Sequence, residues 1–262
     1  MRKPCSVHFL AAGLLLAAFP LDADTGLARV YTARAAELYE KGGYARALSL
    51  AESALLFHPD FSDALYLKSL VLGRERGTRR KALKAARAAA AGGTWERFSP
   101  RDGAVRTAGL LTLTRAYDEA LKVLEGLKPR CADGDHLRVQ CLIGLGDLSG
   151  AMKEIDSALA AYPGDPRFIR AAFLLKDPLD PGVSRLFRLM DRKNPANFPA
   201  FSLYIRRVTS PDGVPALAEE YFSAGGTDPA VSCALLESVP ENRIGELERF
   251  ADLGGFLRMD LE

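Results

Sequence analysis

Residues 38–59 read LYEKGGYARALSLAESALLFHP, and residues 142–163 read LIGLGDLSGAMKEIDSALAAYP. Both stretches place two alanines and a proline at offsets 0, 7 and 12, namely Ala47, Ala54 and Pro59, and Ala151, Ala158 and Pro163. Looser copies of this spacing begin at Ala82, Ala120, Val183 and Leu217. The steps between these first anchors are 35, 38, 31, 32 and 34 residues. A period near 34 predicts a stack of similar helical hairpins without a single closed core.

Each repeat is expected to be a helix, a short turn, a second helix and a turn marked by proline. Residues 28–41 carry apolar side chains at helical spacing, and Gly42 then ends the helix because glycine adopts the left-handed conformation of a helix C-cap. Residues 44–57 resume a helix that has Ala47 and Ala54 two turns apart on one face. Large side chains there would push the two helices apart, so the alanines predict a close crossing.

These two stretches resemble the tetratricopeptide repeat family, and residues 62–90 and 101–127 resemble it less closely. The resemblance implies an all-α fold, an α-solenoid of antiparallel helical hairpins coiled into a right-handed superhelix. Residues 24–163 would form four hairpins, and residues 164–262 would form degenerate hairpins that end in a capping helix over residues 243–253. The family's usual glycine in the first helix is replaced here by Ala35, Ser69, Ala108 and Val139.

Residues 92–103, GGTWERFSPRDG, form an insertion between the second and third hairpins and contain the only tryptophan, Trp95. Long ordered loops on repeat stacks often carry binding residues. The alternative is that Trp95 and Phe98 fill the gap that the insertion creates.

The N-terminus has the pattern of a secretory signal. Arg2 and Lys3 precede an uncharged stretch over residues 7–19, and we expect cleavage after Ala23. An uncleaved membrane anchor is the alternative. The sequence therefore predicts an exported protein, periplasmic or otherwise associated with the bacterial cell envelope, that has no membrane-spanning segment once residues 1–23 are removed.

No motif in the chain indicates catalysis. GxSxG, HExxH and P-loop patterns are absent from the sequence, as are CxxC pairs and Cys/His clusters, so we expect no enzyme activity, no metal and no cofactor. Cys131 and Cys141 either form a disulfide or are small buried residues, and Cys233 is left over. The 35 Lys and Arg nearly balance the 33 Asp and Glu, so net charge argues neither for nor against a nucleic-acid partner. We expect none, because the basic residues within 74–87 are interleaved with alanines and not with aromatic residues, and because export would separate the protein from nucleic acid.

In the resembled family, the first helices of successive hairpins line a concave groove that grips a peptide or a partner helix. The resemblance puts these positions in the groove: Arg29, Thr32, Ala36, Tyr39, Asp63, Tyr66, Leu70, Arg74, Asp102, Val105, Arg106, Gly109, Asp133, His136, Gln140 and Ile143. The candidate partner-binding residues among them are Tyr39, Tyr66, Leu70, Arg106, His136 and Gln140. The chaperone-binding members clamp a terminal carboxylate with Lys, Asn and Arg. The corresponding positions here are Thr32, Ala36, Leu70, Val105 and Gly109, so that function is not supported.

A second candidate surface is a basic stretch made of Arg74, Arg76, Arg79, Arg80, Lys81, Lys84 and Arg87. It would suit an anionic membrane or wall polymer, or it is only the solvated outer face of a helix. The favoured function is therefore a non-enzymatic, protein-binding adaptor of the cell envelope. The alternative is an envelope scaffold that docks through this basic stretch.

Overall fold

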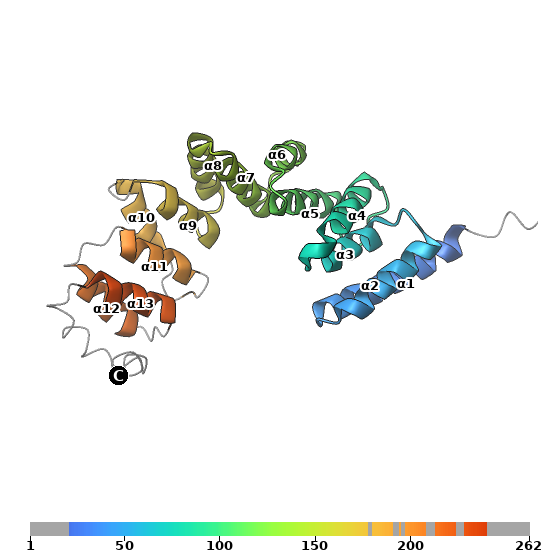
Figure 1. The fold of residues 1–262 in the computed structure, drawn as a ribbon, viewed down its shortest axis with the longest axis horizontal. Coiled ribbons are helices and arrows are strands. Elements are labelled where there is room, and N and C mark those ends of the chain that lie inside the picture. Colours follow the sequence, from blue (N-terminus) through green and yellow to red (C-terminus); the bar gives the residue numbers. More distant parts are fainter. Residues whose placement is uncertain are drawn as a thin grey trace, which may run out of the picture. The chain divides into compact units, whose positions relative to one another are not determined.

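The computed structural model describes residues 21–177, 180–190, 194, 197–207, 213–223 and 228–239 (Figure 1). These residues form helices and connecting turns without any strand, which confirms the expected all-α class. Residues 1–20 of the expected signal and the expected capping helix over residues 243–253 lie outside the described residues. The chain divides into two compact units, the first ending at Pro129 and the second beginning at Arg130. The sequence boundary at residues 163 and 164 falls inside the second unit.

Unit 1 contains three helical hairpins. Its helices are α1 (Leu21–Glu40), α2 (Tyr44–Phe57), α3 (Ser62–Leu72), α4 (Arg79–Ala91), α5 (Pro100–Leu113) and α6 (Tyr117–Glu125), with a short 3₁₀ turn, η1 (Arg76–Thr78), before α4. The hairpins are α1–α2, α3–α4 and α5–α6, and each packs on the next through α2 against α3 and α4 against α5. The first helices, α1, α3 and α5, also contact one another in turn.

Unit 2 begins with the hairpin of α7 (Ala132–Leu145) and α8 (Leu148–Ala161). It continues with α9 (Pro166–Leu175), α10 (Pro181–Leu189), α11 (Phe198–Arg207), α12 (Val214–Ser223) and α13 (Pro229–Ser238). The size of the buried side chains in unit 2 increases along the chain. The α7–α8 hairpin buries Ala151 and Ala158, whereas the later helices pack around the large side chains of Phe173, Phe201 and Tyr221.

Small buried residues hold the helices of each hairpin close together. The anchors of the two best-matching repeats, Ala47, Ala54, Ala151 and Ala158, are all buried. The residues in place of the family's first-helix glycine, Ala35, Ser69, Ala108 and Val139, are buried as well. Because a buried site packed this tightly has no space for added methylene groups, the small side chains at these positions, Val139 excepted, set the distance between the helices.

Three hairpins share one turn geometry, in which a backbone N–H bonds to the carbonyl five residues earlier. These bonds join Gly43 to Leu38 at 2.7 Å, Ala116 to Leu111 at 2.9 Å, and Asp147 to Leu142 at 2.9 Å. The residue before each donor adopts a positive φ, and it is Gly42 (+80°), Arg115 (+61°) and Gly146 (+81°). This is the helix C-terminal motif that favours glycine, so Arg115 occupies a position where a side chain costs energy.

Exchanging residues at this turn position should change stability in opposite directions. Arg115→Gly relieves a left-handed backbone that costs an L-residue about 1 kcal/mol, and it should leave the free energy of unfolding unchanged or raise it by up to about 1 kcal/mol. Gly146→Arg should lower the free energy of unfolding by about 1 kcal/mol or more for the same reason. Urea denaturation followed by circular dichroism measures both, and equal destabilisation by the two exchanges would contradict the turn assignment.

Candidate functional site

Four of the candidate partner-binding residues meet in unit 1, where α1, α3 and α5 adjoin. Arg106 of α5 reaches α3, and its Nη2 donates a hydrogen bond of 2.7 Å to the Ser69 carbonyl. The same nitrogen lies so close to Gly73 that a Cβ on that residue would come within 1.8 Å of it. Burial lowers the pKa of Arg106, and the nearby Tyr39 and Tyr66 oppose that change. The guanidinium remains charged because arginine does not lose its proton in proteins.

Two more residues extend this surface. The ring of Tyr39 meets Tyr44 edge to face at 5.4 Å, and the guanidinium of Arg74 stacks over the Tyr44 ring at 3.8 Å. Leu70 lies one helical turn after Tyr66 on α3, which puts the two side chains on the same side of that helix. We call this set the tyrosine–arginine surface, defined as Tyr39, Tyr44, Tyr66, Leu70, Arg74 and Arg106.

The insertion is tied to α3 through a buried carboxylate. Asp63 accepts hydrogen bonds from the backbone N–H groups of Glu96, Arg97 and Phe98, at 3.2, 2.7 and 3.3 Å. Thr94 bonds the same loop to the residues before α3, since its hydroxyl donates to the Asp60 carbonyl at 2.9 Å. These bonds satisfy backbone groups that would otherwise be unpaired inside the protein, so they fix the course of the loop.

The insertion also forms ion pairs with α1. Glu96 forms an ion pair with Arg29 at 2.6 Å, and Arg97 forms one with Glu40 at 3.2 Å. Residues 29 and 40 of a helix lie about 16 Å apart, so the two ion pairs join the loop to α1 at two separate places. Thr32 and Ala36, which lie between these two places on the helix, are only 2% exposed.

Trp95 and Phe98 fill the space beneath the loop. Phe98 contacts Tyr66 at 4.7 Å and packs on the cluster that contains Ala36 and Leu67, while Trp95 meets Tyr66 at 6.1 Å and leaves no room for a Cβ at Gly103. The geometry therefore supports the gap-filling interpretation of the insertion. The loop is also shorter than expected, because α5 starts at Pro100 and Ser99 forms a capping box with Asp102.

These contacts change the expected groove in unit 1. Thr32, Ala36 and Asp63 are buried, Arg29 is ion-paired to the loop, and Asp102 caps α5. The resemblance placed all five in an open groove, and no pattern in the sequence indicated that the insertion forms ion pairs with α1. The other expected groove positions in unit 1 stay at least partly exposed, and they are Tyr39, Tyr66, Leu70, Arg74 and Arg106 of the tyrosine–arginine surface, together with Val105 and Gly109 of α5.

Removing the Asp63 carboxylate should release the insertion. Asp63→Ala leaves three backbone N–H groups without acceptors, so the free energy of unfolding should fall by roughly 3 kcal/mol. Because Trp95 is the only tryptophan, its fluorescence should move to longer wavelength as the loop loosens. The exposed Asp60 is the matched control, since only its backbone carbonyl is used; Asp60→Ala should change stability by less than about 0.5 kcal/mol. An unshifted Trp95 spectrum in Asp63→Ala would contradict the anchoring role.

The two remaining candidate residues, His136 and Gln140, belong to α7 in unit 2. Their Nε2 atoms lie 2.9 Å apart, and His136 meets the buried Phe168 ring edge to face at 6.1 Å. Arg167 of α9 pairs with Asp133 at 2.6 Å and with Asp165 at 2.7 Å, which joins the starts of α7 and α9. Burial, with the help of Arg167, lowers the pKa of His136 from its ordinary value of 6.5.

The stability of unit 2 should therefore depend on pH through His136. Because its pKa is lower in the folded than in the unfolded chain, the neutral ring favours folding above about pH 6.5, and this contribution is lost as the pH falls below that value. His136→Gln should remove this dependence. The test compares urea denaturation at pH 7.5 and 5.5, where the wild type should lose more stability than the variant. Identical losses would show that His136 makes no such contribution.

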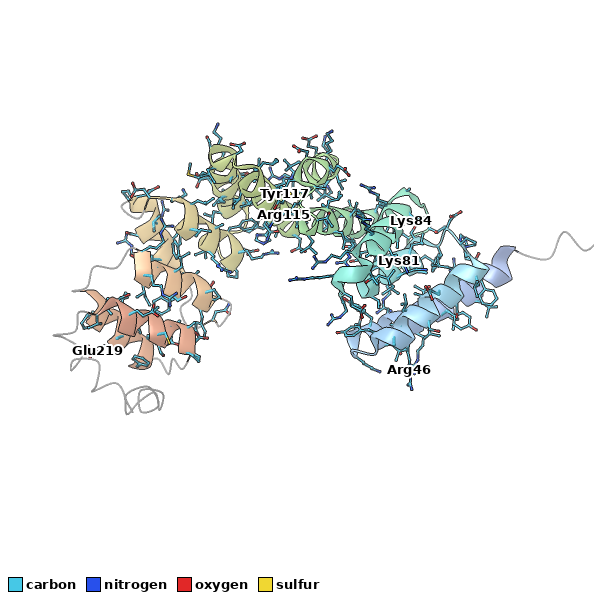
Figure 2. The ribbon with its side chains drawn as sticks, viewed as in Figure 1. Arg46, Lys81, Lys84, Arg115, Tyr117 and Glu219 are labelled. Atoms are coloured by element: carbon cyan, nitrogen blue, oxygen red, sulfur yellow. The ribbon has the colours of Figure 1, made fainter. Side chains whose placement is uncertain are left out.

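The structure divides the basic stretch into separate groups. Arg74 belongs to the tyrosine–arginine surface, and Arg87 forms an ion pair with Glu119 at 2.6 Å. Helix α4 buries Ala82, Ala85, Ala86 and Ala89, and it exposes Arg80, Lys81 and Lys84. Figure 2 labels Lys81 and Lys84. Arg76 is exposed in η1, whereas Arg79 is partly buried. We call Arg80, Lys81 and Lys84 the α4 basic face; no ion pair among the described residues includes them.

The cysteines and acidic residues give no sign of further chemistry in the described part of the chain. Cys131 occupies the N-cap position of α7 without a side-chain capping bond, and Cys141 is buried in the same helix ten residues later, about 15 Å away, which is too far for a disulfide. Within the described ranges, no three His, Cys, Asp or Glu side chains gather as metal ligands would. No helix in those ranges combines the length and the apolar character that a membrane span requires.

Two solved structures of MamA are similar in fold to this chain. MamA from Desulfovibrio magneticus RS-1, from residue 41 to its end, superposes with a TM-score of 0.52 at 17% identity, over 62% of this chain and 92% of that one. A MamA RS-1 ArsTM double mutant gives the same TM-score at 16% identity, over 62% of this chain and 90% of that one. The fold is a tetratricopeptide-like α-solenoid. At this level of identity the likeness shows the fold alone.

The sequence comparisons are sparser. No family model matches the chain. A protein of Treponema pallidum (strain Nichols), described as an uncharacterized protein, is 29% identical over 148 residues, which is 56% of this chain. The match covers 19% of that protein, so this chain corresponds to less than a fifth of its relative.

Proposed function

We propose that this protein is a non-enzymatic adaptor that holds an extended segment of a partner protein on the tyrosine–arginine surface. The single observation that carries the proposal is the convergence of α1, α3 and α5 at Arg106, which touches α3 and is flanked by Tyr39 and Tyr66. Tyrosine and arginine are the residue types that, together with tryptophan, dominate binding energy at protein interfaces. Helices held by buried alanines keep these side chains in fixed positions, which lowers the entropy cost of binding.

The fold supports a binding role over catalysis. Tetratricopeptide-like hairpins present side chains from successive first helices on one extended surface, which suits a peptide better than a small substrate. The charged clusters of the described residues are accounted for by loop anchoring and helix joining, as at Asp63 and Arg167. The proposal therefore assigns no reaction to the chain.

We place this adaptor in the cell envelope on account of the N-terminal pattern. Residues 1–23 combine a basic start with an uncharged stretch and small residues near the expected cleavage site. The mass of the protein recovered from its native cell tests this placement. A chain that begins at Asp24 supports export with cleavage, and an intact chain recovered from the cytoplasmic fraction contradicts it.

Truncating Tyr39 should abolish partner capture. In crosslinking and purification from the native cell, Tyr39→Ala should reduce recovery of the partner strongly, since an aromatic hot spot contributes about 2 kcal/mol, or roughly thirtyfold in affinity. Tyr117, a half-buried tyrosine at the start of α6, is the matched control (Figure 2). Equal recovery with Tyr39→Ala and Tyr117→Ala would contradict the proposed surface.

A second candidate function rests on the α4 basic face. Its three exposed cations lie opposite the buried alanines of α4 and are not neutralised by an ion pair among the described residues. Such a face attracts anionic lipid headgroups or wall polymer, at about 1 kcal/mol per basic residue near the surface. The function would then be that of a scaffold docked on an anionic surface.

Charge reversal tests this second candidate directly. The chain should sediment with phosphatidylglycerol vesicles at low salt, and the triple variant Arg80→Glu, Lys81→Glu and Lys84→Glu should not. The matched control reverses three exposed cations on other helices, Arg46, Lys122 and Lys153. Equal sedimentation by the two triple variants would show that the attraction is a general effect of charge and not of α4.

A further inference from the structure

We infer that the tyrosine–arginine surface selects partner segments that carry an acidic side chain, whose carboxylate is bound by Arg106 while Arg74 adds a second positive charge to the surface. This inference rests on the proposed function and names the chemistry of its partner. It depends on three features of the surface, namely two arginines without acidic partners, a partly desolvated guanidinium, and aromatic and aliphatic side chains beside them.

Arg106 has N–H groups that can donate hydrogen bonds to an acidic partner. Its guanidinium has five N–H donors, of which Nη2 bonds to the Ser69 carbonyl, while Nε is buried and has no acceptor. None of the ion pairs in the described ranges includes Arg106. The buried Nε is out of reach of a partner, whereas the remaining N–H groups on the two Nη atoms have no acceptor among the described residues. A carboxylate complements them best, since it can accept two parallel hydrogen bonds from the end of a guanidinium.

Arg74 adds a second cation on the same side. It follows Gly73, the residue against which the Arg106 guanidinium rests, and its own guanidinium is stacked on the Tyr44 ring. Stacking holds the flat group in place and leaves its edge free for acceptors. Arg74 likewise takes part in no ion pair among the described residues.

The acids of the nearby helix are engaged elsewhere. Glu40, one residue after Tyr39, pairs with Arg97 of the insertion, and Glu37 pairs with Arg34. The residues that define the surface include two arginines and no acid, so they carry a positive charge beside the apolar faces of Tyr39, Tyr66 and Leu70. A segment in which Asp or Glu adjoins an aromatic or aliphatic residue matches both properties, and charge complementarity would favour it over neutral or basic segments.

Selection from a random peptide library displayed on phage tests the inference on the full chain. Asp or Glu should be enriched beside an aromatic or aliphatic position in the selected peptides. In a synthetic selected peptide, exchange of that acid for its amide should weaken binding about tenfold, as expected for a partly exposed charged contact. Fluorescence anisotropy gives the affinities.

Variants of the protein then locate the carboxylate. Arg106→Gln should weaken binding of the acidic peptide about tenfold and should change binding of the amide peptide little. The reason is that the protein variant and the amide exchange in the peptide each remove the same contact, between Arg106 and the carboxylate. Arg74→Gln should act in the same direction with a smaller loss. Arg101, exposed near the start of the same helix as Arg106, is the matched control, and Arg101→Gln should leave both affinities unchanged. Circular dichroism checks that each variant is folded; if Arg106→Gln is not, the exposed Arg74 decides the result.

The outcomes separate this inference from the proposed function. Peptides that require Tyr39 but show no acidic preference, or that bind both arginine variants normally, would overturn the inference and leave the adaptor function standing. Acidic peptides that depend on Arg80, Lys81 and Lys84 in place of Arg106 would overturn it in favour of the α4 basic face. If no selected peptide depends on Tyr39, the proposed function fails together with the inference.

Discussion

The close approach of paired helices at small buried residues is the constraint on which the rest of this structure depends. Ala47 and Ala54 on α2, and Ala35 on α1, have essentially no exposed surface, so the backbones of this hairpin lie near each other. A solenoid has no distant segments to brace it, and each hairpin is held only by its neighbours. Close backbone packing therefore fixes where the first helices present their outward side chains, including Tyr39 and Arg106.

The insertion turns this regular scaffold into a specific surface. A loop between two repeats could extend into solvent. Here Asp63 of α3 accepts hydrogen bonds from three consecutive backbone N–H groups of the loop and holds it against the hairpins. Thr32 and Ala36, which were expected to line the groove, are buried, and Phe98 of the loop packs on the cluster that contains Ala36 and contacts the ring of Tyr66. What remains for a partner is smaller than a full groove and richer in tyrosine and arginine.

The basic residues after α3 are also distributed by the tertiary structure. They lie close together in sequence, within residues 74–87, but in the structure they contact different elements. Arg74 joins the tyrosines, Arg87 neutralises Glu119, and the α4 basic face remains exposed. A charge run on a helix is divided by the helical period, so its net effect depends on which members a neighbouring element pairs.

The sequence by itself determined the class of fold and the positions of most turns in the first 163 residues. The alanine spacing predicted the buried faces, Gly42 predicted the end of α1 within two residues, and residues 44–57 match α2. These features are local, because helical period, glycine and proline act over a few residues. The tertiary structure alone decided that Asp63 is a buried anchor, that the insertion forms ion pairs with α1, and that Arg74 and Arg106 share one surface. Those facts depend on contacts between residues more than thirty positions apart, which no local pattern encodes.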